Sequence, residues 1–216
     1  MGAPGTHAAL IQLAQFAVMG YLLGSIPFGL ILTRLGGYGD LRHIGSGNIG
    51  ATNALRTGNR WIALGTLIGD GGKGALAVLI ARHWGFDAMV VAALCAFIGH
   101  LYPVWIGFRG GKGVATFLGL QLALSWPTGL ICCGAWLVAA ALSRISSVGA
   151  LAATLVGPLA YWYFGYERLF ALCLILSALV WLRHRENIAR ILRGTEPRIG
   201  AAKAPAKPES TEPDPL

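Results

Sequence analysis

The feature that most constrains this chain is a series of long apolar segments separated by short polar ones. Charged residues make up only 12% of the sequence, whereas soluble domains carry about 25%. So few charges cannot cover a globule in water, and we expect most of the chain to lie in lipid, with no separate soluble domain. The apolar segments are residues 8–33, 61–81, 88–107, 114–142, 148–164 and 168–182.

The segment 114–142 leaves the number of spans open, because Pro127 near its middle permits one kinked helix or two short ones. Cytoplasmic loops of membrane proteins are enriched in Lys and Arg, which decides between the two. Seven spans put fourteen basic residues inside and two outside, Arg82 and Arg168, whereas six spans reverse the bias. The sequence therefore predicts an all-α polytopic membrane protein with seven transmembrane helices, the N-terminus outside and the C-terminus cytoplasmic.

The rest of the composition bounds the domains and partners. Residues 1–196 are predicted to form a single transmembrane domain, and the Pro-, Ala-, Lys- and Glu-rich segment 197–216 a disordered cytoplasmic tail. The net charge of +8 would suggest nucleic acid in a soluble protein. Here the basic residues flank apolar segments, so we expect the lipid bilayer and anionic groups as partners and no nucleic acid. The four cysteines form no C-x-x-C pair, and we expect no metal site.

Two glycine-rich stretches carry the polar chemistry. The first is G-S-G-N-I-G-A-T-N, residues 45–53, followed by Arg56; its glycines let consecutive backbone N–H groups turn toward an anion. The second is F-R-G-G-K-G-V-A-T, residues 108–116, in which Lys112 precedes a predicted helix start that favours an anion. It is not a Walker A loop, because Gly113 stands where Ser or Thr is required, so this motif argues against a nucleotide triphosphatase.

Three further polar clusters join them. The seven-span topology puts R-I-S-S, residues 144–147, and R-H-R-E-N-I-A-R, residues 183–190, on the cytoplasmic side as well. Asp70 and Lys73 lie within the second span, where a charged pair is either functional or a self-satisfied packing pair, and the sequence favours neither. Together the clusters predict a site for anionic substrates at the cytoplasmic interface.

These motifs resemble those of the bacterial acyl-phosphate:glycerol-3-phosphate acyltransferases, the PlsY family. The likeness rests on residues 45–53, on G-H-x-x-P from Gly99 followed by 108–116, and on 183–190, and it covers about residues 10–196. It implies a bacterial inner-membrane enzyme that transfers a fatty acyl group from acyl phosphate to the 1-hydroxyl of sn-glycerol 3-phosphate. The implied products are lysophosphatidic acid and phosphate, in phospholipid biosynthesis, with no cofactor.

The resemblance also implies roles for individual residues. The 46–53 loop would hold the acyl-phosphate head. Glycerol phosphate would be held by Arg56, Lys112, Ser146 or Ser147, His184 and Asn187, with the choice between the two serines open. Residues implied to act on the reacting groups are Ser46, Asn48, Thr52 and Lys112. Residues implied to bind substrate are Gly47, Asn53, Arg56, Ser146, Ser147, His184 and Asn187. None of the five histidines has Asp five residues later, so the H-x-x-x-x-D dyad of other glycerol-phosphate acyltransferases is missing.

The same residues bear on three other classes of protein, a transporter, a scaffold and a channel. A transporter for a phosphorylated solute would show inverted repeats and broken helices at the midplane, but the glycine motifs do not recur in reversed order. A non-enzymatic membrane scaffold would not explain the anion-binding loops. A channel is disfavoured because the spans are nearly uniform in Leu, Ala, Val and Ile.

Overall fold

The computed structural model describes residues 6–199, and this part of the chain is all-helical, with no strand. Short 3₁₀ turns connect several of its ten α-helices. The helices are α1 Thr6–Gly24, α2 Phe28–Leu35, α3 Ala51–Ala54, α4 Arg60–Ala81, α5 Phe86–Leu101, α6 Val114–Leu124, α7 Trp126–Ser143, α8 Ser146–Tyr163, α9 Glu167–Arg183 and α10 Arg185–Leu192.

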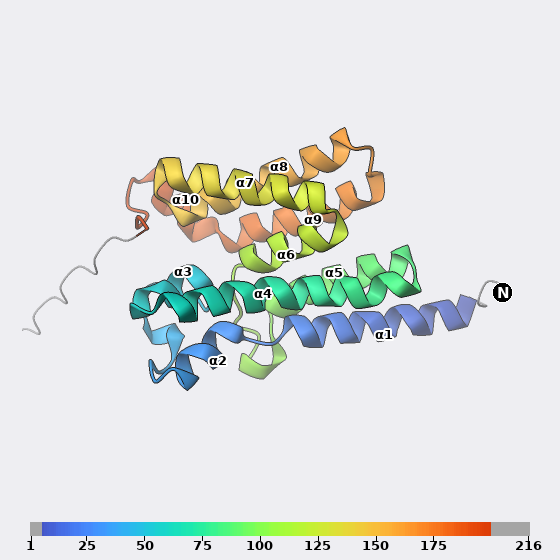
Figure 1. Ribbon diagram of the computed structural model, residues 1–216, viewed down its shortest axis with the longest axis horizontal. Coiled ribbons are helices and arrows are strands. Elements are labelled where there is room, and N and C mark those ends of the chain that lie inside the picture. Colours follow the sequence, from blue (N-terminus) through green and yellow to red (C-terminus); the bar gives the residue numbers. More distant parts are fainter. Residues whose placement is uncertain (1–5, 200–216) are drawn as a thin grey trace, which may run out of the picture.

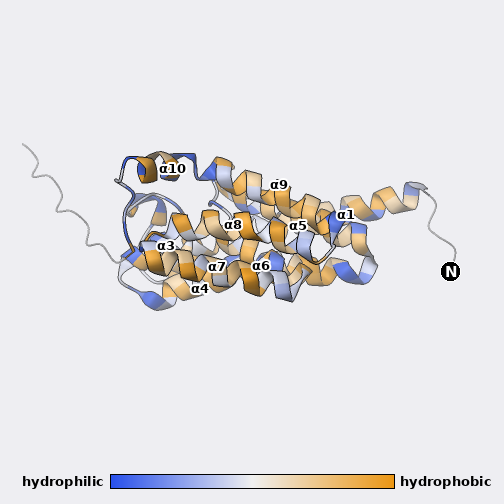
Figure 2. Ribbon diagram, turned by 90° about the horizontal axis from the view of Figure 1, so that it is seen from above, coloured by the Kyte–Doolittle hydropathy of each residue, from blue (hydrophilic) through white to orange (hydrophobic). Residues whose placement is uncertain are grey.

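The long helices form two groups that α6 joins. Helices α1, α4 and α5 pack along one another, α7, α8 and α9 form the second group, and α6 lies between them against α4 and α7 (Figure 1). Most of the helical surface is hydrophobic, and hydrophilic residues gather at the end where α3 and α10 lie (Figure 2). A bundle with an apolar flank and polar ends is the arrangement that a bilayer requires.

Four segments of the described chain are long and apolar enough to span a membrane. They are Thr6–Leu35, Arg60–Trp84, Phe86–Ile106 and Trp126–Ser143. Val114–Leu124 is apolar but has only 11 residues, or about 17 Å at 1.5 Å per residue, against a hydrocarbon core of about 30 Å.

The segment 114–142, which the sequence left open, is two helices. Ser125 is extended, with φ −155°, and separates α6 from α7. Pro127 lies in the first turn of α7, where its missing N–H would have no helical partner in any case. The break therefore falls at Ser125, one residue before α7 begins, and Pro127 is the second residue of the second helix.

Small residues allow two close helix contacts. A Cβ at Gly20 or Gly24 of α1 would lie 2.5 or 1.9 Å from the backbone oxygen of Ala92 or Ala96 in α5, so only glycine fits there. Such small-xxx-small spacings are the usual device for bringing transmembrane helices together.

The end of the described chain folds back on the bundle. The backbone N–H of Ile199 donates to the carbonyl oxygen of Arg144 at 2.7 Å. Of the predicted tail 197–216, only residues 197–199 are described, and the remainder lies outside the described residues.

Candidate active site

A cavity of about 700 Å³ opens at the polar end of the bundle. Segments far apart in the sequence contribute to it: the loop before α3, the loop before α6, the start of α8, and the junction of α9 with α10. Every site residue expected from the sequence lines this cavity. They are Ser46, Gly47, Asn48, Thr52, Asn53, Arg56, Lys112, Ser146, Ser147, His184 and Asn187.

Asn53 organises the first glycine-rich loop from within. Its side-chain oxygen accepts hydrogen bonds from the backbone N–H and the hydroxyl of Ser46, at 3.0 and 3.2 Å. Its amide nitrogen lies within hydrogen-bond distance of three loop carbonyl oxygens, those of Leu41, Ile44 and Asn48. Because Asn53 is buried and its amide is occupied by the loop, this side chain fixes the loop's shape.

Gly45 lets the Arg56 side chain lie against this loop. Its φ is +54°, and a Cβ there would lie 2.7 Å from a guanidinium nitrogen of Arg56. A residue with a side chain would be strained in that conformation and would also push Arg56 away. The glycine therefore lets a fixed positive charge lie against the first glycine-rich loop, at the edge of the cavity.

The second glycine-rich loop rests on His100, at the end of α5. The backbone N–H of Gly111 donates to the carbonyl oxygen of His100 at 3.2 Å, and a Cβ on Gly111 would lie 2.3 Å from His100 Nε2. Arg183 holds the outer side of the loop, with its guanidinium donating to the carbonyl oxygen of Gly110 at 3.0 Å. Lys112 follows, just before α6 begins, and its ammonium projects to the cavity.

A chain of polar contacts connects Lys112 to the end of the described chain. The Lys112 ammonium donates to the side-chain oxygen of Asn187, whose amide donates to Glu196 Oε1. Ser147 donates to the same oxygen at 2.7 Å, and Arg190 donates to Glu196 Oε2 at 2.6 Å. The Glu196 carboxylate thus orients three donors from α8 and α10 around one point.

The neighbouring serine has a different partner. The Ser146 hydroxyl lies 3.0 Å from the Thr52 hydroxyl, whereas Ser147 contacts Glu196. Ser146 therefore connects α8 to the first glycine-rich loop, and Ser147 connects it to the Lys112 side of the cavity. Both serines line the cavity, so the structure does not favour one of them over the other.

Burial and hydrogen bonds shift the charges of this site. Burial lowers the pKa of the Lys112 ammonium, and the nearby Arg190 acts in the same direction. Burial alone would raise the pKa of Glu196, but hydrogen bonds from Asn187, Ser147 and Arg190 bring it below its usual value. Lys112 therefore gives up its proton more readily than a free lysine, whereas the Glu196 carboxylate stays ionised.

Burial lowers the pKa of His184 to about 4, so its imidazole is neutral near pH 7. Its Nδ1 lies 2.8 Å from the carbonyl oxygen of Val180. A carbonyl oxygen only accepts, so Nδ1 carries the proton and Nε2 is left as an acceptor.

Beneath the cavity lies a buried polar cluster inside the helices. Lys73 donates to Asp70 Oδ1 and to the carbonyl oxygen of Ile26, both at 2.7 Å, and the side chains of the ion pair are each 2% exposed. His100 Nδ1 lies 3.7 Å from the same carboxylate oxygen. Thr116 of α6 donates to the backbone oxygen of Asp70 at 2.9 Å. The cluster ties α4 to the break between α1 and α2, to α5 and to α6, directly below the Gly111 loop.

Comparison with known proteins identifies the fold and its family. The model of the glycerol-3-phosphate acyltransferase family matches residues 14–194. A glycerol-3-phosphate acyltransferase from Cereibacter sphaeroides is 60% identical over 198 residues, which cover 91% of this chain and 94% of the relative. This chain belongs to the glycerol-3-phosphate acyltransferase family. Another member, from Brucella ovis, is 55% identical over 201 residues, which cover 93% of this chain and 99% of that protein.

Two crystal structures of PlsY, described as an integral membrane glycerol 3-phosphate acyltransferase, have the same fold. The glycerol 3-phosphate form aligns with a TM-score of 0.83 at 37% identity, covering 87% of this chain and 96% of that one. The lysophosphatidic acid form aligns with a TM-score of 0.80 at 36% identity, covering 86% and 94%. The expected resemblance to the PlsY family is thereby confirmed, and this chain is a membrane protein of that family.

Three residues of this acyltransferase-family site escaped the sequence analysis. Glu196 stands in R-G-T-E, which carries no motif, and nothing in the sequence brings it to Ser147. Arg183 stands in the cytoplasmic cluster 183–190 but was not among the expected site residues, and its guanidinium donates to the carbonyl oxygen of Gly110. His100 was noted only within G-H-x-x-P, although its position beside Gly111 and Asp70 makes it the support of the loop.

Proposed function

We propose that this protein transfers a fatty acyl group from acyl phosphate to the 1-hydroxyl of sn-glycerol 3-phosphate, giving lysophosphatidic acid and phosphate. The single observation that carries the proposal is the cavity, in which two separate sets of anion-binding groups face each other. Arg56 with the Asn48 and Thr52 side chains of the first glycine-rich loop forms one set, and Lys112 with Asn187 and His184 forms the other. A reaction between two phosphate-bearing substrates needs both sets.

The first set suits the acyl-phosphate head. Asn48 and Thr52 of the loop held by Asn53 line the cavity with polar side chains. Arg56, which the resemblance implied for glycerol phosphate, lies against this loop and adds a full charge that an acyl phosphate can share. The acyl chain needs an apolar path, which Leu67, Leu118 and Leu137 supply along the same cavity. Leu67 and Leu137 are exposed on the flank of the bundle, so the chain can enter from the bilayer.

The second set suits glycerol 3-phosphate. The Lys112 ammonium and the Asn187 amide would bind its phosphate, with Ser147 and Arg190 beside them. The neutral His184 would accept a hydrogen bond from a glycerol hydroxyl at Nε2. Glu196 acts as a positioning residue, because its carboxylate already holds Asn187, Ser147 and Arg190 in place.

The reaction needs little more than this arrangement. Acyl phosphate is a mixed anhydride with a good leaving group, so holding the 1-hydroxyl against its carbonyl carbon supplies much of the rate. The hydroxyl oxygen forms the new ester bond, the carbonyl–phosphate bond breaks, and the hydroxyl proton passes to a phosphate oxygen of a substrate. The cations and N–H groups stabilise the negative charge that develops on the way.

The proposed setting is the bacterial inner membrane, with seven spans, the N-terminus outside and the cavity on the cytoplasmic side. The basic residues near the cavity end, Arg56, Lys112 and Arg190 among them, support this orientation by the positive-inside rule. A reporter fused after Arg198 should be cytoplasmic. Alkaline phosphatase activity from that fusion would overturn the orientation.

The donor is tested with purified protein and three acyl donors: palmitoyl phosphate, palmitoyl-CoA and palmitoyl-acyl carrier protein. We expect lysophosphatidic acid, identified by mass spectrometry, only from palmitoyl phosphate together with glycerol 3-phosphate. The thioesters should fail, because the cavity holds no H-x-x-x-x-D dyad to serve a poorer leaving group. Equal turnover with palmitoyl-CoA would refute the proposed donor.

A further inference from the structure

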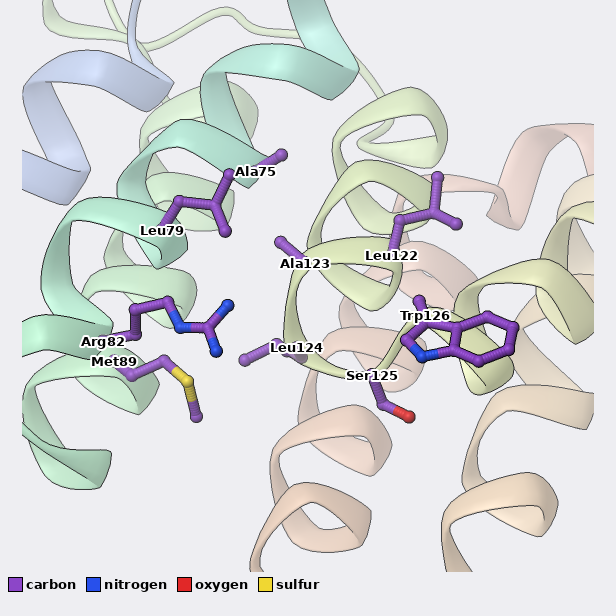
Figure 3. A pocket seen from close by; sticks show the side chains of 9 residues that line it. All are labelled: Ala75, Leu79, Arg82, Met89, Leu122, Ala123, Leu124, Ser125 and Trp126. Atoms are coloured by element: carbon purple, nitrogen blue, oxygen red, sulfur yellow. The ribbon is translucent and has the colours of Figure 1, made fainter.

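A second cavity, of about 490 Å³, lies beside the C-terminal third of α4, beyond the part of that helix that reaches the candidate site. Along α4 the candidate site reaches Asp70 and this cavity begins at Ala75, about 7.5 Å further on at 1.5 Å per residue. The cavity lies between the last turns of α4, the start of α5 and the junction of α6 with α7 (Figure 3). It shares no lining residue with the site described above.

The shortness of α6 creates this space. Helix α6 ends at Leu124 after 11 residues, whereas α4 continues beside it to Ala81. Ser125 is extended and leads directly into α7. The final turns of α4 therefore face a gap that no helix fills, with Leu79 on one side and Leu122 and Leu124 on the other (Figure 3).

One positive charge points into this otherwise apolar space. The guanidinium of Arg82 extends into the cavity toward Leu124 (Figure 3). Within residues 6–199, its side chain makes no hydrogen bond or ion pair, and no acidic residue lines the cavity. Arg168, at the same end of the bundle, differs because it is paired with Asp87. The charge of Arg82 is thus unbalanced by the protein, and it faces a surface that suits hydrocarbon.

The walls of the cavity reach the lipid-facing flank. Leu79, Leu122 and Trp126 are 43%, 39% and 68% exposed, which an integral membrane protein turns toward lipid. Tryptophan collects where hydrocarbon meets the headgroups, and Trp126 lines the same cavity as Arg82. A chain of CH₂ groups ending in a phosphate matches both parts of the lining.

We propose that this cavity binds one anionic phospholipid, with its phosphate on Arg82 and an acyl chain along Leu79 and Leu122. The lipid supplies the counter-charge that the described chain lacks, and it fills the gap that α6 leaves beside α4. The site is separate from the acyl-transfer cavity, and the proposal stands whether or not the proposed reaction is correct.

Native mass spectrometry of the purified protein in mixed micelles tests this. The micelles contain equal amounts of phosphatidylglycerol and phosphatidylcholine, and the bound lipid is counted after stepwise collisional activation. We expect one retained phosphatidylglycerol on the native protein, and about fivefold less on Arg82→Ala, as the loss of one basic contact at a membrane surface implies. Arg82→Lys should retain it, which separates loss of charge from loss of fold.

The matched control is Arg168→Ala, which removes a basic residue from the same end of the bundle. Because Asp87 neutralises Arg168, this variant should retain the lipid as the native protein does. Ala75→Phe keeps every charge but fills the cavity, and it should release the lipid. Equal losses from Arg82→Ala and Arg168→Ala would overturn the proposal, as would no loss from either or no preference for phosphatidylglycerol. A lipid-free dimer would overturn it in favour of a second copy as the occupant.

Discussion

Replacing Asp70 by Leu tests what the buried cluster contributes. The side chains of Asp70 and Lys73 are each 2% exposed, and the Lys73 ammonium has two oxygen partners, Asp70 Oδ1 and the carbonyl of Ile26. Removing the carboxylate leaves an uncompensated positive charge inside the helices. Breaking such a pair from one side costs about 3–5 kcal/mol, whereas replacing both partners by apolar residues of similar volume is often neutral.

The assay is unfolding by SDS in mixed micelles, followed by helical circular dichroism, for Asp70→Leu, Lys73→Met and the double variant. We expect Asp70→Leu to lose about 3–5 kcal/mol and the double variant to recover most of that loss. Turnover of the folded double variant then separates the two interpretations that the sequence left open. Activity close to native supports a packing pair, and a stable but inactive double variant supports a functional one. A single variant as stable as the double variant would refute the reasoning about buried charge.

The other predictions concern the cavity. Lys112→Ala should lower kcat/KM by at least about tenfold, because a hydrogen bond to a charged group contributes about 1.5–3 kcal/mol; Lys112→Arg should recover little, and the exposed Arg109→Ala, from the same loop, should stay active. Glu196→Gln should raise the KM for glycerol 3-phosphate more than it lowers kcat, because it loosens Asn187 and Arg190 without contacting the acyl donor. Equal increases in the KM values for glycerol 3-phosphate and palmitoyl phosphate would contradict this. Native protein should be destabilised relative to His184→Gln as the pH falls from 7 to 5, since the folded pKa of about 4 lies below the unfolded value of 6.5. The unfolded state then binds the proton first, and the difference reaches about 2 kcal/mol at pH 5; parallel stability curves for the two proteins would refute this.

Sequence patterns predicted the two glycine-rich loops but not the buried side chains that hold those loops in place. The glycines of residues 45–53 and 108–113 predicted two loops, because a backbone that turns sharply needs glycine. The structure brings both loops to one cavity. The supports come from side chains that meet only after folding. Asp70 and His100 lie thirty positions apart on different helices, and their contact depends on how α4 packs against α5.

The region around Pro127 shows the same limit for the helices. Hydropathy alone treats 114–142 as one apolar segment, and a proline in it signals an interruption without fixing its position. Ser125 is the residue that leaves the helix, because its extended backbone lets α6 stop and α7 begin against α8. The consequence of that early stop, the second cavity beside Arg82, depends on the neighbouring helix being longer and could not be read from residues 114–142.

The kinetic mechanism, sequential or ping-pong, tests the central claim that both substrates occupy one cavity and react directly. Several hydroxyls line the cavity, and Ser147 is hydrogen-bonded to Glu196. That carboxylate is a poor base because its pKa is lowered, so we expect no acyl-enzyme. The decisive measurement is the initial rate of phosphate release over a grid of palmitoyl phosphate and glycerol 3-phosphate concentrations. Intersecting double-reciprocal lines and no phosphate release without glycerol 3-phosphate are the predicted result. Parallel lines with a burst of phosphate from palmitoyl phosphate alone would contradict direct transfer.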